Sequence, residues 1–70
     1  MTVEQLTNWF SYHTPTGDDL ERYAKIRKAA LAFALTIDDV CPESADKTTA
    51  VRKVREAMMI ANASIACKGK

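Results

Sequence analysis

The side chains best suited to chemistry lie in the first half of this 70-residue chain. Residues 9–13, Trp-Phe-Ser-Tyr-His, form an aromatic cluster that contains the only histidine. A row of cations follows it: Arg22, Lys25, Arg27 and Lys28. A flat aromatic ring near cations suits a nucleotide, because the ring stacks on a base while the cations form charge-assisted hydrogen bonds with phosphate. Tyr12 and this basic row are therefore candidates for a nucleotide site, and a solvated helix face is the alternative explanation of the cations.

Catalytic arrangements are not evident in the sequence. His13 has no Ser/His/Asp or Cys/His partner at a spacing that indicates nucleophilic catalysis. Asp38 and Asp39 are adjacent carboxylates, but neighbouring helical residues point about 100° apart and do not converge on one substrate. We expect this pair to be a solvated helix end and His13 to make a structural hydrogen bond. The sequence therefore predicts a protein that is not an enzyme and has no cofactor.

The composition excludes several other classes. Ten Lys and Arg against nine Asp and Glu give a formal charge of +1, which argues against a binder of DNA or RNA polymers, so any anion site must be local. Cys41 and Cys67 fall at opposite ends of the hairpin predicted below, and we expect reduced thiols and no metal site. Residues 1–4 lack the basic start of a signal peptide, and no apolar run approaches the roughly 20 residues of a membrane helix. We expect a cytosolic protein without a membrane partner.

Two long helices are predicted from apolar residues at alternating steps of three and four, which mark one stripe of each helix. The stripe of the first helix, about residues 17–40, contains Tyr23, Ile26, Ala30, Phe33, Ile37 and Val40. That of the second helix, about residues 45–67, contains Val51, Val54, Met58, Ala61 and Ile65. A short helix at about residues 2–10 precedes them. Matched lengths and a short connection favour an antiparallel helical hairpin, so we predict one all-α domain over residues 1–70.

Residues with capping propensity mark the predicted helix ends. The candidates are Thr2 with Gln5 for the short helix, Thr16 or Asp18 for the first long helix, and Ser44 or Asp46 for the second. Residues 68–70, Lys-Gly-Lys, supply a glycine stop and two cations at the end of the last helix. The connections between these signals are short, which agrees with a hairpin.

A pair of helices encloses no core, so this hairpin must be covered by something else. Apolar side chains also fall outside the two stripes: Leu31, Leu35, Met59, Ile60 and Ala63. The short helix, which must itself dock Leu6, Trp9 and Phe10, is too small to cover them all. At this size a monomer is only marginally stable. We therefore predict a homo-oligomer in which hairpins pack side by side.

A third row lies on the second long helix, away from its apolar stripe. Its members mix polar and apolar types at steps of three and four: Arg52, Arg55, Met59, Asn62 and Ala66. Such a row suits a half-buried subunit interface or a second anion pocket, and the sequence leaves both open.

Three segments together resemble the small phage proteins of the anti-CBASS sponge family, whose hairpin domain is shared with anti-Thoeris sponges. They are residues 10–15 (Phe-Ser-Tyr-His-x-Pro), 22–29 (Arg-Tyr-x-x-Ile-Arg-x-Ala) and 54–66 (Val-Arg-Glu-Ala-Met-x-x-Ala-Asn-Ala-x-Ile-Ala). The resemblance spans most of the chain. It implies a helical hairpin that assembles into hexamers and binds cyclic dinucleotides such as cyclic GMP-AMP, withholding them from the host's antiphage effector without hydrolysis.

Individual roles follow from the same resemblance. It implies that Tyr12 stacks on a base and that Arg27, where the family typically has a lysine, contacts phosphate; Lys25 and His13 lie beside them. Some members also hold cyclic trinucleotides in a separate pocket, for which Arg55 and Asn62 are the candidates. The resemblance thus implies an immune-evasion sponge in the cytoplasm of the infected bacterium.

Two other classes of function remain open at the level of sequence. A structural or adaptor hairpin that binds a protein partner would explain the excess apolar surface equally well. A small nucleic-acid-binding module would use the basic rows on phosphates, although the near-neutral charge argues against it.

Overall fold

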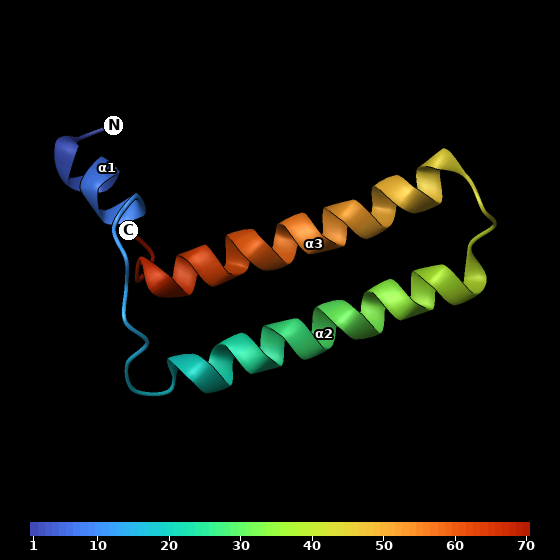
Figure 1. Ribbon diagram of the computed structural model, residues 1–70, viewed down its shortest axis with the longest axis horizontal. Coiled ribbons are helices and arrows are strands. Elements are labelled where there is room, and N and C mark those ends of the chain that lie inside the picture. Colours follow the sequence, from blue (N-terminus) through green and yellow to red (C-terminus); the bar gives the residue numbers. More distant parts are fainter.

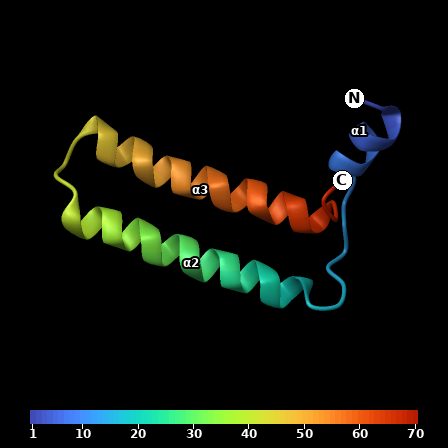
Figure 2. The ribbon, with the colours of Figure 1, turned by 180° about the vertical axis from the view of Figure 1, so that it is seen from behind.

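The computed structural model describes all residues, 1–70, and contains three helices and no strand. They are α1 (Val3–Trp9), α2 (Asp19–Val40) and α3 (Ala45–Ala66). α2 and α3 lie antiparallel and side by side, joined by a tight turn, while α1 stands at the open end of the hairpin next to the C-terminus (Figures 1 and 2). The molecule is elongated, with extents of 44 × 27 × 15 Å. The predicted all-α class and the predicted hairpin are confirmed.

The packing stripe of α3 is the predicted one, since Val51, Val54, Met58, Ala61 and Ile65 are all half-buried. In α2 the stripe departs from the prediction beyond Ala30. Phe33 and Val40 are 59% and 68% exposed, whereas Ala34 and Cys41 are half-buried. An α-helix has about 3.6 residues per turn, so a strict alternation of three and four drifts away from a straight partner. The half-buried residues of α2 therefore include two successive steps of four, from Ile26 to Ala30 and from Ala30 to Ala34, which keep the stripe on the side that packs against α3.

The hairpin encloses almost nothing. Only Ile37 and Lys47 are buried, at 7% and 8% exposure. The apolar residues predicted to lie outside the stripes, Leu31, Leu35, Met59, Ile60 and Ala63, are all exposed. No helix combines the length and the apolar composition that a bilayer crossing requires.

α1 does not cover these apolar surfaces. α2 and α3 form the only extensive helix–helix interface, and the side chains expected to dock α1 remain in solvent. Leu6, Trp9 and Phe10 are 42%, 54% and 84% exposed. The surface on which these three side chains were expected to dock is therefore not supplied within one chain, because the connection at residues 11–18 carries α1 past the end of the helix pair (Figure 1).

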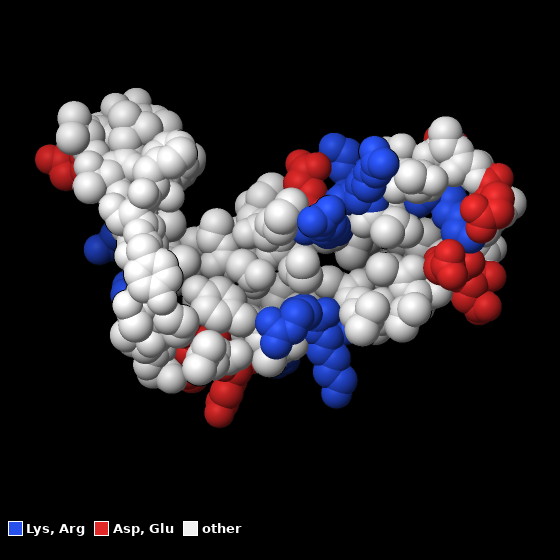
Figure 3. All heavy atoms as spheres, viewed as in Figure 1, with Lys and Arg blue, Asp and Glu red and all other residues white.

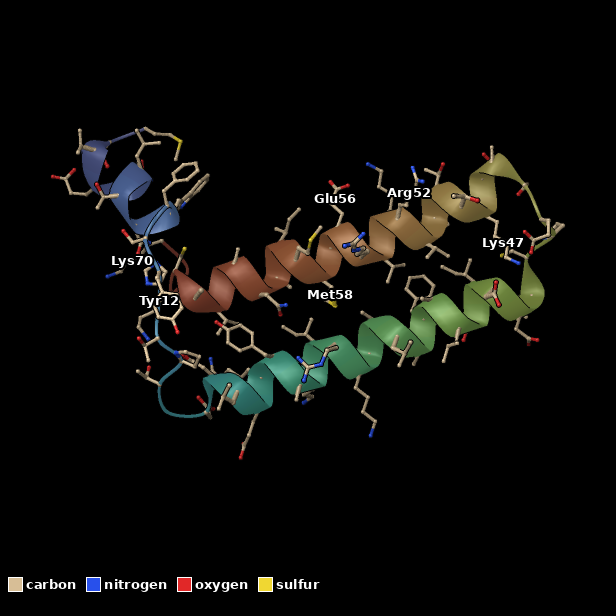
Figure 4. The ribbon with its side chains drawn as sticks, viewed as in Figure 1. Tyr12, Lys47, Arg52, Glu56, Met58 and Lys70 are labelled. Carbon is tan, nitrogen blue, oxygen red and sulfur yellow. The ribbon has the colours of Figure 1, made fainter.

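A buried lysine closes the turn between the long helices. Lys47 Nζ donates to Glu43 Oε1 at 2.6 Å and to the carbonyl oxygen of Asp38 at 2.9 Å, and it lies 3.3 Å from Asp38 Oδ1 (Figure 4). Asp38 is solvated at the helix end, as expected, with its side chain 75% exposed. It also belongs to this cluster, because the turn folds α3 back so that Lys47 reaches the last turn of α2.

The predicted N-terminal caps are present in two of the three helices. Thr2 and Gln5 form a complete capping box, and the hydroxyl of Ser44 accepts from Lys47 N. At α2 neither predicted side chain caps the helix: Asp18 occupies the N-cap position without a side-chain bond. The carboxylate of Asp19 accepts from the backbone N of Thr16 instead.

The end of α3 is a Schellman motif. Gly69 N donates to Ser64 O and Lys68 N donates to Ile65 O, which satisfies carbonyls that the helix leaves unpaired. The expected glycine is present one residue late: Lys68, with φ 55°, occupies the left-handed position that glycine normally takes, and Gly69 follows with φ 74°. A side chain is thus held in a conformation that costs about 1–2 kcal/mol.

The Lys47 cluster predicts a loss of stability at alkaline pH. Hydrogen bonding to Glu43, and secondarily to Asp38, raises the pKa of Lys47 above its ordinary 10.5, against the opposing effect of desolvation. A raised folded-state pKa stabilises the protein fully below the unfolded value and ceases to do so as pH rises through the folded value. We expect the wild type to melt higher than Lys47→Met at about pH 8, and this difference to narrow above about pH 11. Melting curves followed by circular dichroism measure it.

Lys53→Met is the matched control, because Lys53 pairs with Glu56 in the open, with its side chain 69% exposed. Lys53→Met should change the free energy of unfolding by less than about 0.5 kcal/mol at every pH. A Lys47→Met curve that runs parallel to the wild-type curve up to the highest pH would contradict the role assigned to the charged amine.

The Schellman motif predicts that Lys68→Gly stabilises the hairpin by about 0.5–1 kcal/mol, because glycine adopts the left-handed conformation without strain. Gly69→Ala should do the reverse, costing about 1 kcal/mol through the backbone alone, since a Cβ at Gly69 would meet nothing within 4 Å. Urea unfolding of both variants measures the two effects. Equal stabilities for Lys68→Gly and the wild type would show that the strain is absent.

Candidate ligand-binding site

Tyr12 lies on the segment that leads out of α1, and hydrogen bonds hold the backbone on both sides of it. Phe10 N donates to Leu6 O at 3.1 Å, and the hydroxyl of Ser11 donates to Thr7 O. On the other side His13 is tied back to Asn8. The Tyr12 ring itself is 85% exposed. A ring presented to solvent on a fixed backbone can stack on a planar ligand with little loss of chain entropy.

His13 makes the structural hydrogen bond that was expected of it. Its Nε2 lies 2.6 Å from the carbonyl oxygen of Asn8. Because a carbonyl only accepts, Nε2 carries the proton and is not available as a base. His13 therefore fixes the loop next to Tyr12. A ligand site that used Tyr12 would gain from this hydrogen bond a ring held in place.

The fold also places a thiol beside this histidine. Cys67 Sγ lies 4.0 Å from His13 Nε2 and donates to the same Asn8 carbonyl at 3.8 Å. Sequence reasoning did not find this pair, because the two residues are 54 positions apart and only the antiparallel hairpin brings the end of α3 to the start of the chain. Both cysteines are free.

The cations of α2 are exposed, and most have no partner in the chain. Arg22 pairs with Asp18 at 3.1 Å, whereas Lys25, Arg27 and Lys28 form no ion pair. Arg27 lies eight residues beyond the start of α2, about 12 Å along the helix. No hydrogen bond joins Lys25 or Arg27 to Tyr12 or His13 within the chain. The predicted site residues thus share the open half of the hairpin without forming an enclosed pocket.

The residues of the predicted second pocket are also not brought together. Arg55 is exposed and unpaired, whereas Asn62 is half-buried and its Oδ1 is buried without a hydrogen-bond donor. Neither lines one of the two main grooves of the molecule. The Oδ1 of Asn62 is thus enclosed by the chain itself and is not presented to a partner molecule.

The two grooves are apolar. The larger, about 600 Å³, runs between α2 and α3 and is lined by residues such as Ile26, Phe33 and Met58. The smaller, about 450 Å³, lies between Trp9 and the outer surface of α3, where Ile60 and Ala63 line it. Neither suits a small anion by itself, since each is lined mainly by aliphatic and aromatic carbon.

Charge is segregated along the hairpin. Figure 3 shows Lys and Arg side chains gathered around the middle of the two long helices and acidic side chains mostly toward the two ends. The basic middle comprises Arg22, Lys25, Arg27 and Lys28 of α2 with Arg52, Lys53 and Arg55 of α3. A chain of net charge +1 therefore carries a local cationic band, which is what an anionic ligand requires.

The sequence model of the Acb2/Tad1 hairpin domain matches residues 2–66. The chain belongs to this family. Acb2 is the anti-CBASS sponge family, so the resemblance stated from the sequence is confirmed. No curated protein and no solved structure matches the chain.

Membership of the Acb2/Tad1 hairpin family implies a cyclic-nucleotide sponge, a protein that binds its ligand and does not turn it over. The geometry agrees with this class: an exposed ring, a fixed loop and a set of unpaired cations on an incompletely covered hairpin.

Proposed function

We propose that this protein is a phage-encoded sponge that sequesters cyclic dinucleotides, cyclic GMP-AMP among them, in the cytoplasm of the infected bacterium. It withholds these messengers from the defence effector by mass action and leaves them intact. The observation that carries the proposal is the exposed Tyr12 ring on a hydrogen-bonded loop, in a chain of the Acb2/Tad1 hairpin family whose Lys25, Arg27 and Lys28 are unpaired.

Affinity requires more than one copy of the site. A sponge must bind more tightly than the effector, which means a dissociation constant near nanomolar or about −12 kcal/mol. Stacking on one ring contributes only about 1–3 kcal/mol. Because Tyr12 and Arg27 do not converge within one chain, we propose that the ring of one copy and the cations of another enclose the ligand. A cyclic dinucleotide is itself nearly two-fold symmetric and suits a two-fold interface.

The assembly we propose is a hexamer, as the family resemblance implies. The exposed apolar residues of α2 and α3 supply the surface that such packing would bury. In this assembly Arg55 and Asn62 would form the second pocket, for cyclic trinucleotides.

The alternative function is an adaptor hairpin that binds a protein partner through the same apolar surfaces. The observation in its favour is the groove of about 600 Å³ between α2 and α3, whose lining is almost entirely apolar. An adaptor needs neither the exposed ring nor the unpaired cations, which is why we favour the sponge.

Titration calorimetry with cyclic GMP-AMP tests the ligand. We expect the wild type to bind, Tyr12→Ala to lose about 1–3 kcal/mol of binding free energy and Arg27→Ala about 1.5–3 kcal/mol. Arg52→Ala is the control for the general field of the cationic band, since Arg52 is an exposed arginine of that band that forms no ion pair and is not among the residues proposed to contact the dinucleotide. Chromatography of the ligand released by heat should recover it unchanged.

A panel of cyclic dinucleotides and trinucleotides that neither binds nor raises the melting temperature of the wild type would remove the sponge function and leave the adaptor. Incomplete recovery of intact ligand after its release by heat would instead indicate that the protein hydrolyses the ligand. Equal losses for Arg27→Ala and Arg52→Ala would show that the cations attract the ligand only through the general field of the protein.

Association of copies is a separate prediction. Because stability and assembly are linked, the melting temperature of the wild type should rise with protein concentration. Sedimentation velocity at micromolar concentration should give one defined assembly larger than a single chain. A protein that stays folded as a lone subunit under these conditions would contradict the shared site.

A further inference from the structure

The N-terminal segment is attached to the hairpin by three polar contacts at the end of α3. Asn8 Nδ2 donates to the carbonyl oxygen of Cys67 at 3.3 Å, and Cys67 Sγ donates to the carbonyl oxygen of Asn8 at 3.8 Å. Trp9 Nε1 donates to the carbonyl oxygen of Lys70 at 3.2 Å. We refer to these three contacts as the Asn8 junction. No comparable contact joins α1 to α2.

The end of α3 is suited to receive this segment. The last carbonyls of a helix lack partners within the helix, and the Schellman motif satisfies only those of Ser64 and Ile65. The carbonyls of Cys67 and Lys70 lie just beyond the helix, where the donors of Asn8 and Trp9 reach them, and the carbonyl of Cys67 also accepts from Lys70 N at 3.1 Å. Figure 4 shows that Tyr12 and Lys70 both lie at this end of the molecule.

Asn8 links this junction to the loop that carries Tyr12. Its side chain holds α3, while its carbonyl oxygen accepts from His13 Nε2 at 2.6 Å, one residue beyond Tyr12. The only other tether between Tyr12 and the cations is the connection at residues 14–18. This connection contains Gly17 in the left-handed conformation, with φ 57°. Without the Asn8 junction, the ring would be placed by this connection alone.

We infer that Asn8 is a positioning residue: it holds the Tyr12 loop on the C-terminal end of α3 and so fixes the ring relative to its own hairpin before ligand arrives. Asn8 does not touch the ligand. The inference rests on the proposed function in one respect, that Tyr12 contacts the ligand. A preorganised ring avoids the entropy of ordering the loop on binding, so the junction acts on affinity.

Asn8→Asp tests the inference, because it keeps the shape of the side chain, removes both amide donors and places a negative oxygen against the Cys67 carbonyl. We expect cyclic GMP-AMP to bind about tenfold more weakly to this variant. The single tryptophan reports the junction directly: emission of Trp9 should shift to the red as the indole leaves Lys70. Asn8→Ala, without the added charge, should give a smaller loss in the same direction.

Two controls separate the junction from general weakening of α1. Thr7→Asp adds the same charge one residue away without removing a donor of the junction, and Gln5→Ala breaks the capping box at the other end of α1. Both should bind as the wild type does, within about twofold. Far-ultraviolet circular dichroism confirms that every variant is folded at the temperature of the titration.

A double-mutant cycle distinguishes positioning from stability. If Asn8 acts through Tyr12, Tyr12→Ala should cost less affinity in the Asn8→Asp background than in the wild type. Additive losses, or an unchanged Trp9 emission, would overturn the inference while leaving the proposed function intact. A wild type that binds no cyclic nucleotide would defeat the proposed function, and the inferred effect on affinity with it.

Discussion

Two helices that pack against each other bury one stripe of each and leave the rest in solvent, and this geometric limit governs the whole molecule. Ile37 is the only apolar side chain that becomes buried in a chain of 70 residues. The hydrophobic stabilisation available to a single copy is therefore small, since it scales with the apolar area removed from water. Polar interactions at the ends of the helices therefore contribute a larger share of the stability of a single copy.

These polar interactions are concentrated at the two ends of the hairpin. At the turn, Lys47 joins Glu43 and Asp38, and Ser44 caps α3. At the open end, Asn8 and Trp9 donate to carbonyls just beyond the end of α3. Because a long helix pair is easily opened from its ends, contacts in these two places restrain the structure more than the same contacts in the middle would.

The middle of the hairpin is left for function by the same limit. Lys25, Arg27 and Lys28 of α2 form no ion pair, and the ring of Tyr12 is not buried in a core. This is consistent with membership of the Acb2/Tad1 hairpin family. A protein with a closed core of this size would have few side chains left for a ligand.

The sequence by itself determined the all-α class, the hairpin, the α3 stripe, the caps at Thr2 and Ser44 and the family, because these depend on periodicity, local hydrogen bonding and motif spacing. It misplaced Phe33 and Val40, since the drift between a 3.5 and a 3.6 repeat is settled only by the partner helix. It also missed the burial of Lys47 and the meeting of Asn8, His13 and Cys67. These contacts join residues on different elements, up to 59 positions apart, and no local pattern encodes them. Only the return of α3 to the start of the chain decides where the ring of Tyr12 is held.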